Sequence, residues 1–153
     1  MIKPMLAYKV DQKPIDWTTK VYLQPKLDGV RCIFTKDGAY SRAGNEFKNV
    51  AHIKYDLTDF FRKHPNAVLD GELYNHALKD NFEKIISLVR KQKPTDQDAR
   101  DAENLVQYHV YDTIAEGPDY GDRFNWLIRY LPIAATMTLI KNTVVESQDE
   151  AKM

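Results

Sequence analysis

Lys26-Leu27-Asp28-Gly29-Val30-Arg31 is the stretch of sequence that decides how the first half of this chain folds. Over residues 30–35 the side chains alternate between two sets, with the two-residue period of a strand. Residues 36–38 end in Asp-Gly, a pair that favours a tight hairpin. We therefore predict that residues 30–35 pair with a returning strand over residues 39–42. The Asp28-Gly29 turn can expose the tip of Lys26 between two strands.

Strands and helices are interspersed along the rest of the chain. Further strands are predicted over residues 21–26, 68–74, 105–112 and 143–145. Helices are predicted over residues 53–64 on an apolar stripe and from Asp80 to Val89 with Glu83 completing a capping box. A further helix is predicted over residues 123–139, with Pro132 as a kink or break. Residues 91–103 are polar and predict a loop. The pattern indicates an α+β fold with mainly antiparallel sheets and flanking helices.

The composition is typical of one globular domain. The chain has 153 residues, 43% of them hydrophobic and 29% charged, and no apolar stretch long enough to cross a bilayer. Its first residues lack the apolar run of a secretory signal, and its single cysteine, Cys32, cannot form an internal disulfide. These features predict a cytoplasmic protein without a membrane segment, in which Cys32 packs in the sheet.

The charges balance, with 22 basic and 22 acidic residues. A domain that binds DNA through bulk charge is usually basic, so any DNA contact has to come from a local face. Lys36, Arg42, Lys48 and Lys54 are the candidates for that face, although a solvated surface would give the same pattern. The four histidines have no metal-binding spacing, and we interpret His109 as a structural residue of a strand.

Three further motifs follow the Lys-x-Asp-Gly-x-Arg stretch, in this order: Ser41-Arg42 before Gly44, Leu69-Asp70-Gly71-Glu72-Leu73, and Tyr108-His109-Val110-Tyr111-Asp112. The first motif alone occurs by chance in roughly one chain of this length in several hundred. The set resembles the covalent nucleotidyltransferases, which are DNA ligases, RNA ligases and mRNA-capping enzymes. Pro4-Met5-Leu6-Ala7 is similar to a segment common in ATP-dependent DNA ligases, which favours the DNA branch.

The resemblance implies both a fold and a reacting residue. The fold would be an ATP-grasp-like nucleotidyltransferase (adenylation) domain. Lys26 would take AMP from ATP and pass it to the 5′-phosphate of nicked double-stranded DNA, so that the nick can be sealed. The lysine must lose its proton to act as a nucleophile. Its free pKa of about 10.4 puts roughly 4.6 kcal/mol between it and the reactive form at neutral pH, a barrier that desolvation, nearby cations or Mg²⁺ can lower.

The same resemblance assigns roles to other residues. Beside Lys26, the nucleotide-binding set would be Gln24, Pro25, Leu27, Arg31, Arg42, Glu72 and Tyr111. The arginines would neutralise phosphate charge, Glu72 would hold a ribose hydroxyl or Mg²⁺, and Tyr111 would stack on adenine. Asp112 would hold Mg²⁺ or a basic partner. Gln24 replaces an acid that often reads adenine in the family, and Arg123 is a weak match to an arginine that follows the stacking strand.

The family pattern continues beyond these motifs. It includes a later Glu-Gly strand, a Lys-x-Lys strand that binds the α-phosphate, and an OB-fold domain, and we find none of them in the sequence. Glu116-Gly117 runs into Pro118, which suits a turn, and Lys141 has Thr143 two residues on. We therefore expect residues 1–153 to form a partial adenylation domain, incomplete at its C-terminal end, with little nick-sealing activity of its own.

Other interpretations stay open at this point. An RNA ligase or a capping-type guanylyltransferase belongs to the same superfamily, and labelling with ATP or GTP would separate these enzymes. A fragment that binds only a nucleotide or a protein partner, without catalysis, is an alternative of another class. The leading interpretation is a monomeric ATP-dependent DNA ligase of replication, repair and recombination that uses ATP and Mg²⁺.

Overall fold

The architecture was analysed in a computed structural model, which describes residues 21–23, 29–114, 119–132, 134–140 and 143–145. Its elements in chain order are β1 (Val21–Leu23), β2 (Val30–Thr35), β3 (Gly38–Tyr40), α1 (Ala51–Asp56), α2 (Thr58–Lys63), β4 (Leu69–Tyr74), the 3₁₀ helix η1 (His76–Leu78), α3 (Phe82–Val89), α4 (Asp96–Leu105), β5 (Gln107–Thr113), α5 (Tyr120–Tyr130), β6 (Met137–Leu139) and β7 (Thr143–Val145).

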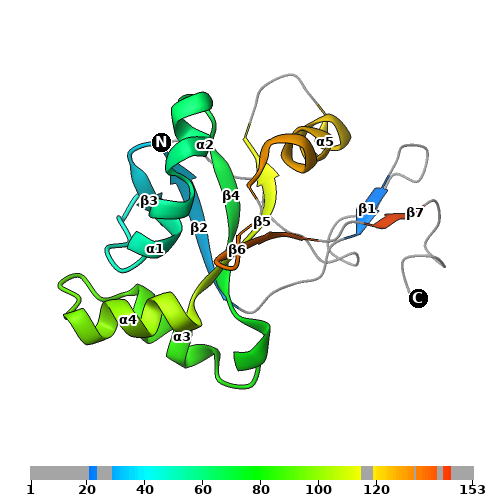
Figure 1. The fold of residues 1–153 in the computed structure, drawn as a ribbon. Coiled ribbons are helices and arrows are strands. Elements are labelled where there is room, and N and C mark those ends of the chain that lie inside the picture. Colours follow the sequence, from blue (N-terminus) through cyan, green and yellow to red (C-terminus); the bar gives the residue numbers. More distant parts are fainter. Residues whose placement is uncertain (1–20, 24–28, 115–118, 133, 141–142, 146–153) are drawn as a thin grey trace.

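A five-stranded sheet of order β3-β2-β4-β5-β6 forms the centre of the fold. Adjacent strands of this sheet are antiparallel except β5 and β6, which are parallel. Strands β1 and β7 form a separate antiparallel pair. Helices α1 to α4 gather along one face of the sheet, and α5 lies beside the end of β5 (Figure 1). The predicted α+β fold with mainly antiparallel sheet is confirmed.

The predicted hairpin forms the β2–β3 edge of this sheet. Thr35 pairs with Gly38, and the φ of +145° at Gly38 is a backbone conformation that glycine adopts without strain. A residue with a Cβ would be strained at that position, so the tight turn depends on glycine. This local chemistry explains why the first half of the fold could be predicted from the sequence.

The hydrophobic core lies between the sheet and the helical layer. Phe34 and Tyr108 are fully buried with their ring centroids 4.9 Å apart, and the Tyr108 hydroxyl donates to the carbonyl oxygen of Cys32 at 2.8 Å. Cys32 is itself fully buried in the sheet, as predicted. The apolar stripe of residues 53–64 is also buried, but it is divided between α1 and α2, which meet at Leu57.

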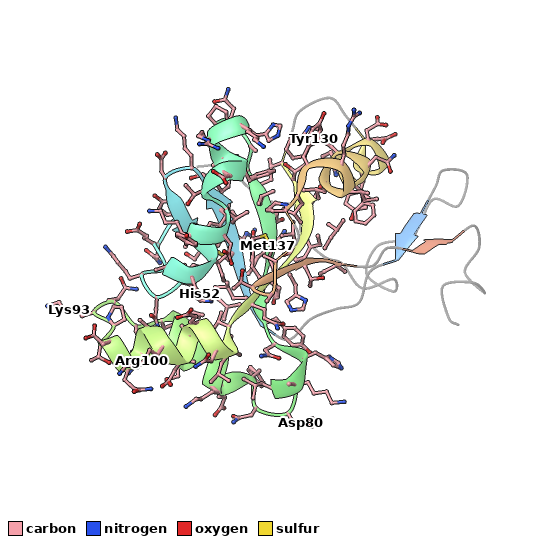
Figure 2. All side chains as sticks on the ribbon, viewed as in Figure 1. His52, Asp80, Lys93, Arg100, Tyr130 and Met137 are labelled. Atoms are coloured by element: carbon pink, nitrogen blue, oxygen red, sulfur yellow. The ribbon has the colours of Figure 1, made fainter. Side chains whose placement is uncertain are left out.

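Three sequence predictions about helices are wrong in detail. Asp80 does not cap α3, because that helix begins after Asn81, which makes no side-chain cap hydrogen bond. Asp80 lies at the outer end of the molecule (Figure 2). Residues 91–103 are not a loop throughout, since α4 begins at Asp96 with a capping box between Thr95 and Asp98. That box was overlooked because its acid is aspartate rather than the more usual glutamate.

The third error concerns residues 123–139. Helix α5 spans Tyr120–Tyr130, and its N-cap Asp119 accepts a hydrogen bond from the backbone N–H of Asp122. The chain leaves the helix before Pro132, which cannot donate the backbone hydrogen bond that a helix interior needs, and it continues into β6. Pro132 is the local signal for the end of the helix, whereas the parallel pairing of the next segment with β5 has no signal in the local sequence.

Among the described residues, no helix is long and apolar enough to cross a membrane.

His52 on α1 links the helical layer to the sheet. Its Nε2 lies 2.8 Å from the carbonyl oxygen of Val106, just before β5. Burial lowers the pKa of His52 below the usual value of 6.5, against the opposing effects of the Val106 hydrogen bond and of Glu103 and Asp56. The native state therefore binds a proton here less readily than the unfolded chain does.

Replacing His52 with Gln is expected to reduce the loss of stability in mild acid. The contribution of the neutral imidazole is complete above the unfolded pKa of about 6.5 and is lost as the pH falls through that value toward the lower folded pKa. Glutamine keeps a donor near the Nε2 position and does not titrate. Thermal melting between about pH 7.5 and about pH 5.5 tests this, with exposed His76→Gln as the control, and equal pH dependence in H52Q and the unaltered chain would contradict it.

Candidate nucleotide-binding site

Strands β2, β4 and β5 bring the sequence motifs together. Arg31 on β2 pairs with Glu72 on β4, and Glu72 pairs with His109 on β5. Directly opposed residues of antiparallel strands lie on the same face of the sheet. We call Gly29, Arg31, Asp70, Glu72 and Tyr111 the strand cluster.

The main-chain N–H of Gly29 donates to Oε2 of Glu72 at 3.1 Å. A Cβ on Gly29 would collide with the carbonyl oxygen of Leu73 and lie 3.1 Å from Cγ of Glu72. The first motif therefore needs glycine here because the backbone of β2 enters the sheet in close contact with β4. This contact joins the Lys-x-Asp-Gly motif to the Asp-Gly-Glu motif.

Arg31 forms a paired contact with the buried carboxylate of Asp70. Nη2 lies 2.8 Å from Oδ2 and Nε lies 3.2 Å from Oδ1. The Asp70 side chain is only 1% exposed and that of Arg31 22%. Burial raises the pKa of the Asp70 carboxyl, and the hydrogen bonds and charge of Arg31 oppose that rise. Since two nitrogens of Arg31 are held by Asp70, its predicted role in phosphate binding stays a prediction.

Tyr111 is positioned by the same ion pair. The guanidinium carbon of Arg31 lies 5.7 Å from the centroid of the Tyr111 ring, and the Tyr111 hydroxyl hydrogen-bonds to Asp70. Burial raises the pKa of this phenol, and the charge of Asp70 raises it further, so it remains protonated. Asp70 pairs with Asp112 whereas Gly71 pairs with Val110, which leaves Tyr111 as the extra residue of a β-bulge. Bulges of this kind change the direction in which side chains point, and they are frequent beside active sites.

Helix α5 is fastened to β5 at the same place. The Tyr120 hydroxyl donates to the carbonyl oxygen of Tyr111 at 2.7 Å, and Nε of Arg123 lies 2.9 Å from Oδ1 of Asp112. That oxygen also accepts the backbone N–H of Thr113 at 2.8 Å. Asp112 therefore has a basic partner, the second of the two roles predicted for it. Within the described ranges, no group of three or more His, Cys, Asp or Glu residues could hold a metal, and metal binding by Asp112 stays a prediction.

Several predicted site residues lie outside this cluster or outside the described residues. Gln24, Pro25, Lys26 and Leu27 belong to the latter group, as do Pro4-Met5-Leu6-Ala7, Glu116-Gly117 and Lys141. Arg42 is exposed in the turn that follows β3. Lys36, Lys48 and Lys54 are also exposed, and Lys48 makes a surface ion pair with Glu46 at 3.1 Å.

The sequence prediction missed two residues that organise the cluster. Asp70 lies inside the recognised Asp-Gly-Glu motif, and its isolated charge in an apolar strand was the signal that a cationic partner lies opposite. Tyr120 had no such signal, because its contact with the Tyr111 carbonyl depends on how α5 docks on the sheet. Tertiary packing, rather than any local pattern, selects that residue.

Two cavities flank the sheet. One, of about 580 Å³, is lined mainly by residues before β4, after β5 and on α5, including His64 and Trp126. None of the predicted nucleotide-binding residues that the structure describes lines it. The other, of about 720 Å³, adjoins the turn after β3 and is lined by Ser41, Lys48 and Arg90 among others. The second cavity combines backbone turns with two basic side chains.

Removing the Asp70 carboxylate is expected to destabilise the domain strongly. Asp70→Ala leaves a partly buried guanidinium without its partner, which typically costs about 3–5 kcal/mol. Arg62→Ala is the matched control, because it removes the exposed pair that Arg62 forms with Asp59 and should cost less than about 1 kcal/mol. Urea unfolding of both variants measures the difference, and equal losses would show that the Arg31–Asp70 pair does not anchor the sheet.

Solved structures share this architecture. A Lig E DNA ligase matches with a TM-score of 0.72 at 22% identity, over 97% of this chain and 54% of that chain. A protein named Pmar-Lig_Pre matches with a TM-score of 0.68 at 20% identity, over 96% and 36%. The ATP-dependent DNA ligase of bacteriophage T7, solved with ATP, matches with a TM-score of 0.55 at 16% identity, over 87% and 51%. The sheet and its helices therefore have the fold of a ligase adenylation domain.

The sequence family agrees with the fold. The family described as "ATP dependent DNA ligase domain" matches residues 4–153, which is nearly the whole chain. The chain belongs to this family of ATP-dependent DNA ligase domains. It spans about half the length of the Lig E structure, 54% of that chain. No curated protein sequence matches it.

Proposed function

We propose that this chain carries the nucleotide-accepting lysine of an ATP-dependent DNA ligase, Lys26, and takes part in sealing nicked double-stranded DNA. The observation that carries the proposal is the contact between Gly29 and Glu72, which joins the Lys-x-Asp-Gly motif to the Asp-Gly-Glu motif in a domain of the ligase family. Lys26 precedes Gly29 by only three residues. The proposal requires that the side chain of Lys26 reach the strand cluster from this position.

The proposed reaction has three group transfers. The neutral Nζ of Lys26 attacks the α-phosphorus of ATP, a phosphorus–nitrogen bond forms, and pyrophosphate leaves. An oxygen of the DNA 5′-phosphate then attacks the same phosphorus and releases the lysine. The 3′-hydroxyl finally attacks the activated 5′-phosphorus, and AMP leaves as the phosphodiester bond forms.

The strand cluster suits the nucleoside part of ATP. Tyr111 is half-buried, held at its hydroxyl by Asp70 and at its ring by Arg31, so its orientation is set before a base arrives. A fixed aromatic ring of this kind can stack on adenine. Glu72 can accept a hydrogen bond from a ribose hydroxyl. Arg42, exposed after β3, and the outer part of Arg31 are the proposed contacts to phosphate.

The carboxylates near the cluster fit a magnesium ion that is held mainly by the phosphates of the substrate. Asp70 and Asp112 both pair with arginines, and Glu72, whose Oε2 accepts the backbone N–H of Gly29, is the carboxylate that we propose as a ligand of the ion. Mg²⁺ commonly binds through one or two carboxylates together with phosphate oxygens. When bound, the ion would neutralise charge on the phosphates and favour the neutral form of a nearby lysine.

Nicked DNA is the proposed second substrate. The cavity of about 720 Å³ beside the turn after β3 is lined by Lys48, Arg90 and Glu46, and Glu46 pairs with Lys48. Arg90 is therefore the basic side chain of this cavity that we propose as a contact to the DNA backbone.

Covalent labelling tests the proposed nucleophile. After incubation with ATP and Mg²⁺, mass spectrometry of the intact chain should find a fraction that has gained one AMP, mapped to Lys26. Lys26→Ala should lose the adduct completely because no other amine is placed by the motif, while the exposed hairpin variant Lys36→Ala should retain it. An adduct that persists in K26A would refute the assignment.

Binding of nicked duplex DNA tests the proposed groove. Arg90→Ala should weaken binding and lower the slope of log affinity against log salt by about one, since one phosphate contact is lost. Arg100→Ala on the outer face of α4 is the control, and it should leave the slope unchanged (Figure 2). Identical slopes for R90A and the unaltered chain would place the DNA elsewhere.

A further inference from the structure

His109 lies beside Glu72 on the same face of the sheet. The two residues are direct partners across β4 and β5, and His109 is in turn the partner of Thr138 on β6. Directly opposed side chains have their Cβ atoms about 4.5–5.5 Å apart. A group that is held by the Glu72 carboxylate is therefore within reach of the His109 imidazole.

The imidazole of His109 is held in a defined orientation. Its Nε2 lies 3.1 Å from Oε1 of Gln107, and its ring meets that of Tyr74 edge-on at 5.2 Å between centroids. Because Oε1 of Gln107 can only accept, Nε2 carries the proton and Nδ1 becomes an acceptor. No hydrogen bond to Nδ1 occurs within the described part of the chain. A purely structural role does not require a hydrogen-bond acceptor that is held in a fixed orientation.

The surroundings of His109 favour the neutral ring. Burial lowers its pKa below the usual value, and the nearby His76 lowers it further. Apart from Glu72, the other side chains around it, Tyr74, Gln107 and Thr138, are uncharged. This side of Glu72 thus offers hydrogen-bonding groups without charge, which suits hydroxyl groups better than phosphates.

The position of Tyr111 fixes which part of a nucleotide would meet His109. Both residues are half-buried, and they lie on the face of the sheet that carries Glu72 and Asp70, because His109 pairs with Glu72 and the Tyr111 hydroxyl hydrogen-bonds to Asp70. Two residues of a strand span about 6.8 Å, which is close to the distance between the centre of a purine and the far edge of its ribose. A base stacked on Tyr111 can therefore direct its sugar toward the space between Glu72 and His109.

We propose that His109 is a second ribose-binding residue of the site, with Nδ1 accepting a hydrogen bond from a ribose hydroxyl while Glu72 binds the sugar from the other side. This inference rests on the proposed ATP-binding function. It makes His109 a specificity-determining residue that distinguishes ribonucleotides from deoxyribonucleotides as donors of AMP. It also changes our sequence interpretation of His109, which regarded it as structural.

Nucleotide titrations followed by NMR test this role. His109→Ala should weaken ATP binding about 3- to 10-fold, as expected for the loss of one hydrogen bond. The same substitution should leave unchanged the binding of whichever analogue, 2′-deoxy-ATP or 3′-deoxy-ATP, lacks the contacted hydroxyl. His109→Asn, whose amide oxygen can replace Nδ1, should stay within about twofold of the unaltered chain for ATP. The neighbouring His76→Asn is the matched control and should also stay within about twofold of it.

These outcomes distinguish a failure of the His109 assignment from a failure of the proposed ATP binding. If H109A and the unaltered chain bind ATP equally, or if H109A weakens ATP and both deoxy analogues by the same factor, His109 does not contact the ribose although ATP binding stands. If the unaltered chain binds no ATP, the proposed function and this inference both fail. Circular dichroism of each variant verifies that it is folded, and H109N provides the comparison should H109A unfold.

Discussion

The ion pair between Arg31 and Asp70 is the interaction on which the arrangement of the site depends. It joins β2 to β4 through a carboxylate that is almost completely buried, and it holds the ring and the hydroxyl of Tyr111 on β5. A buried charge is tolerated only with a well-placed partner. The pair therefore fixes the relative positions of three strands and, with them, of the three motifs that they carry.

The two faces of the central sheet have different functions. One face is apolar and packs against α1 to α4 (Figure 1), and Phe34 and Tyr108 are fully buried in the core between them. The other carries Arg31, Glu72 and His109 in one cross-strand row. Strand periodicity produces this division, because successive residues point to opposite faces. A rigid core on one face thus supports hydrogen-bonding groups on the other, as an accurately positioned site requires.

The family assignment and the cluster geometry support each other in different ways. The family match covers residues 4–153 and indicates that the proposed reaction is that of an ATP-dependent DNA ligase. The structural similarity to ligases, at 16–22% identity for the Lig E and T7 enzymes, shows the fold alone. The contacts of Gly29, Asp70 and Asp112 then supply physical reasons for the motif residues. Glycine is needed for close approach of two strands, and the aspartates hold arginines that fix β4 and α5.

The sequence alone determined the features that depend on local chemistry. The Asp-Gly pair predicted the β2–β3 hairpin, alternation predicted β2, and the ordered motifs predicted the family. Tertiary structure alone decided the features that depend on pairing between distant segments. These are the partnership of Asp112 with Arg123, the bulge at Tyr111, the parallel pairing of β6 with β5 and the position of His109 beside Glu72, which arise when strands and helices dock. No local pattern encodes them, because each depends on a register or a packing contact between residues that local sequence windows do not join.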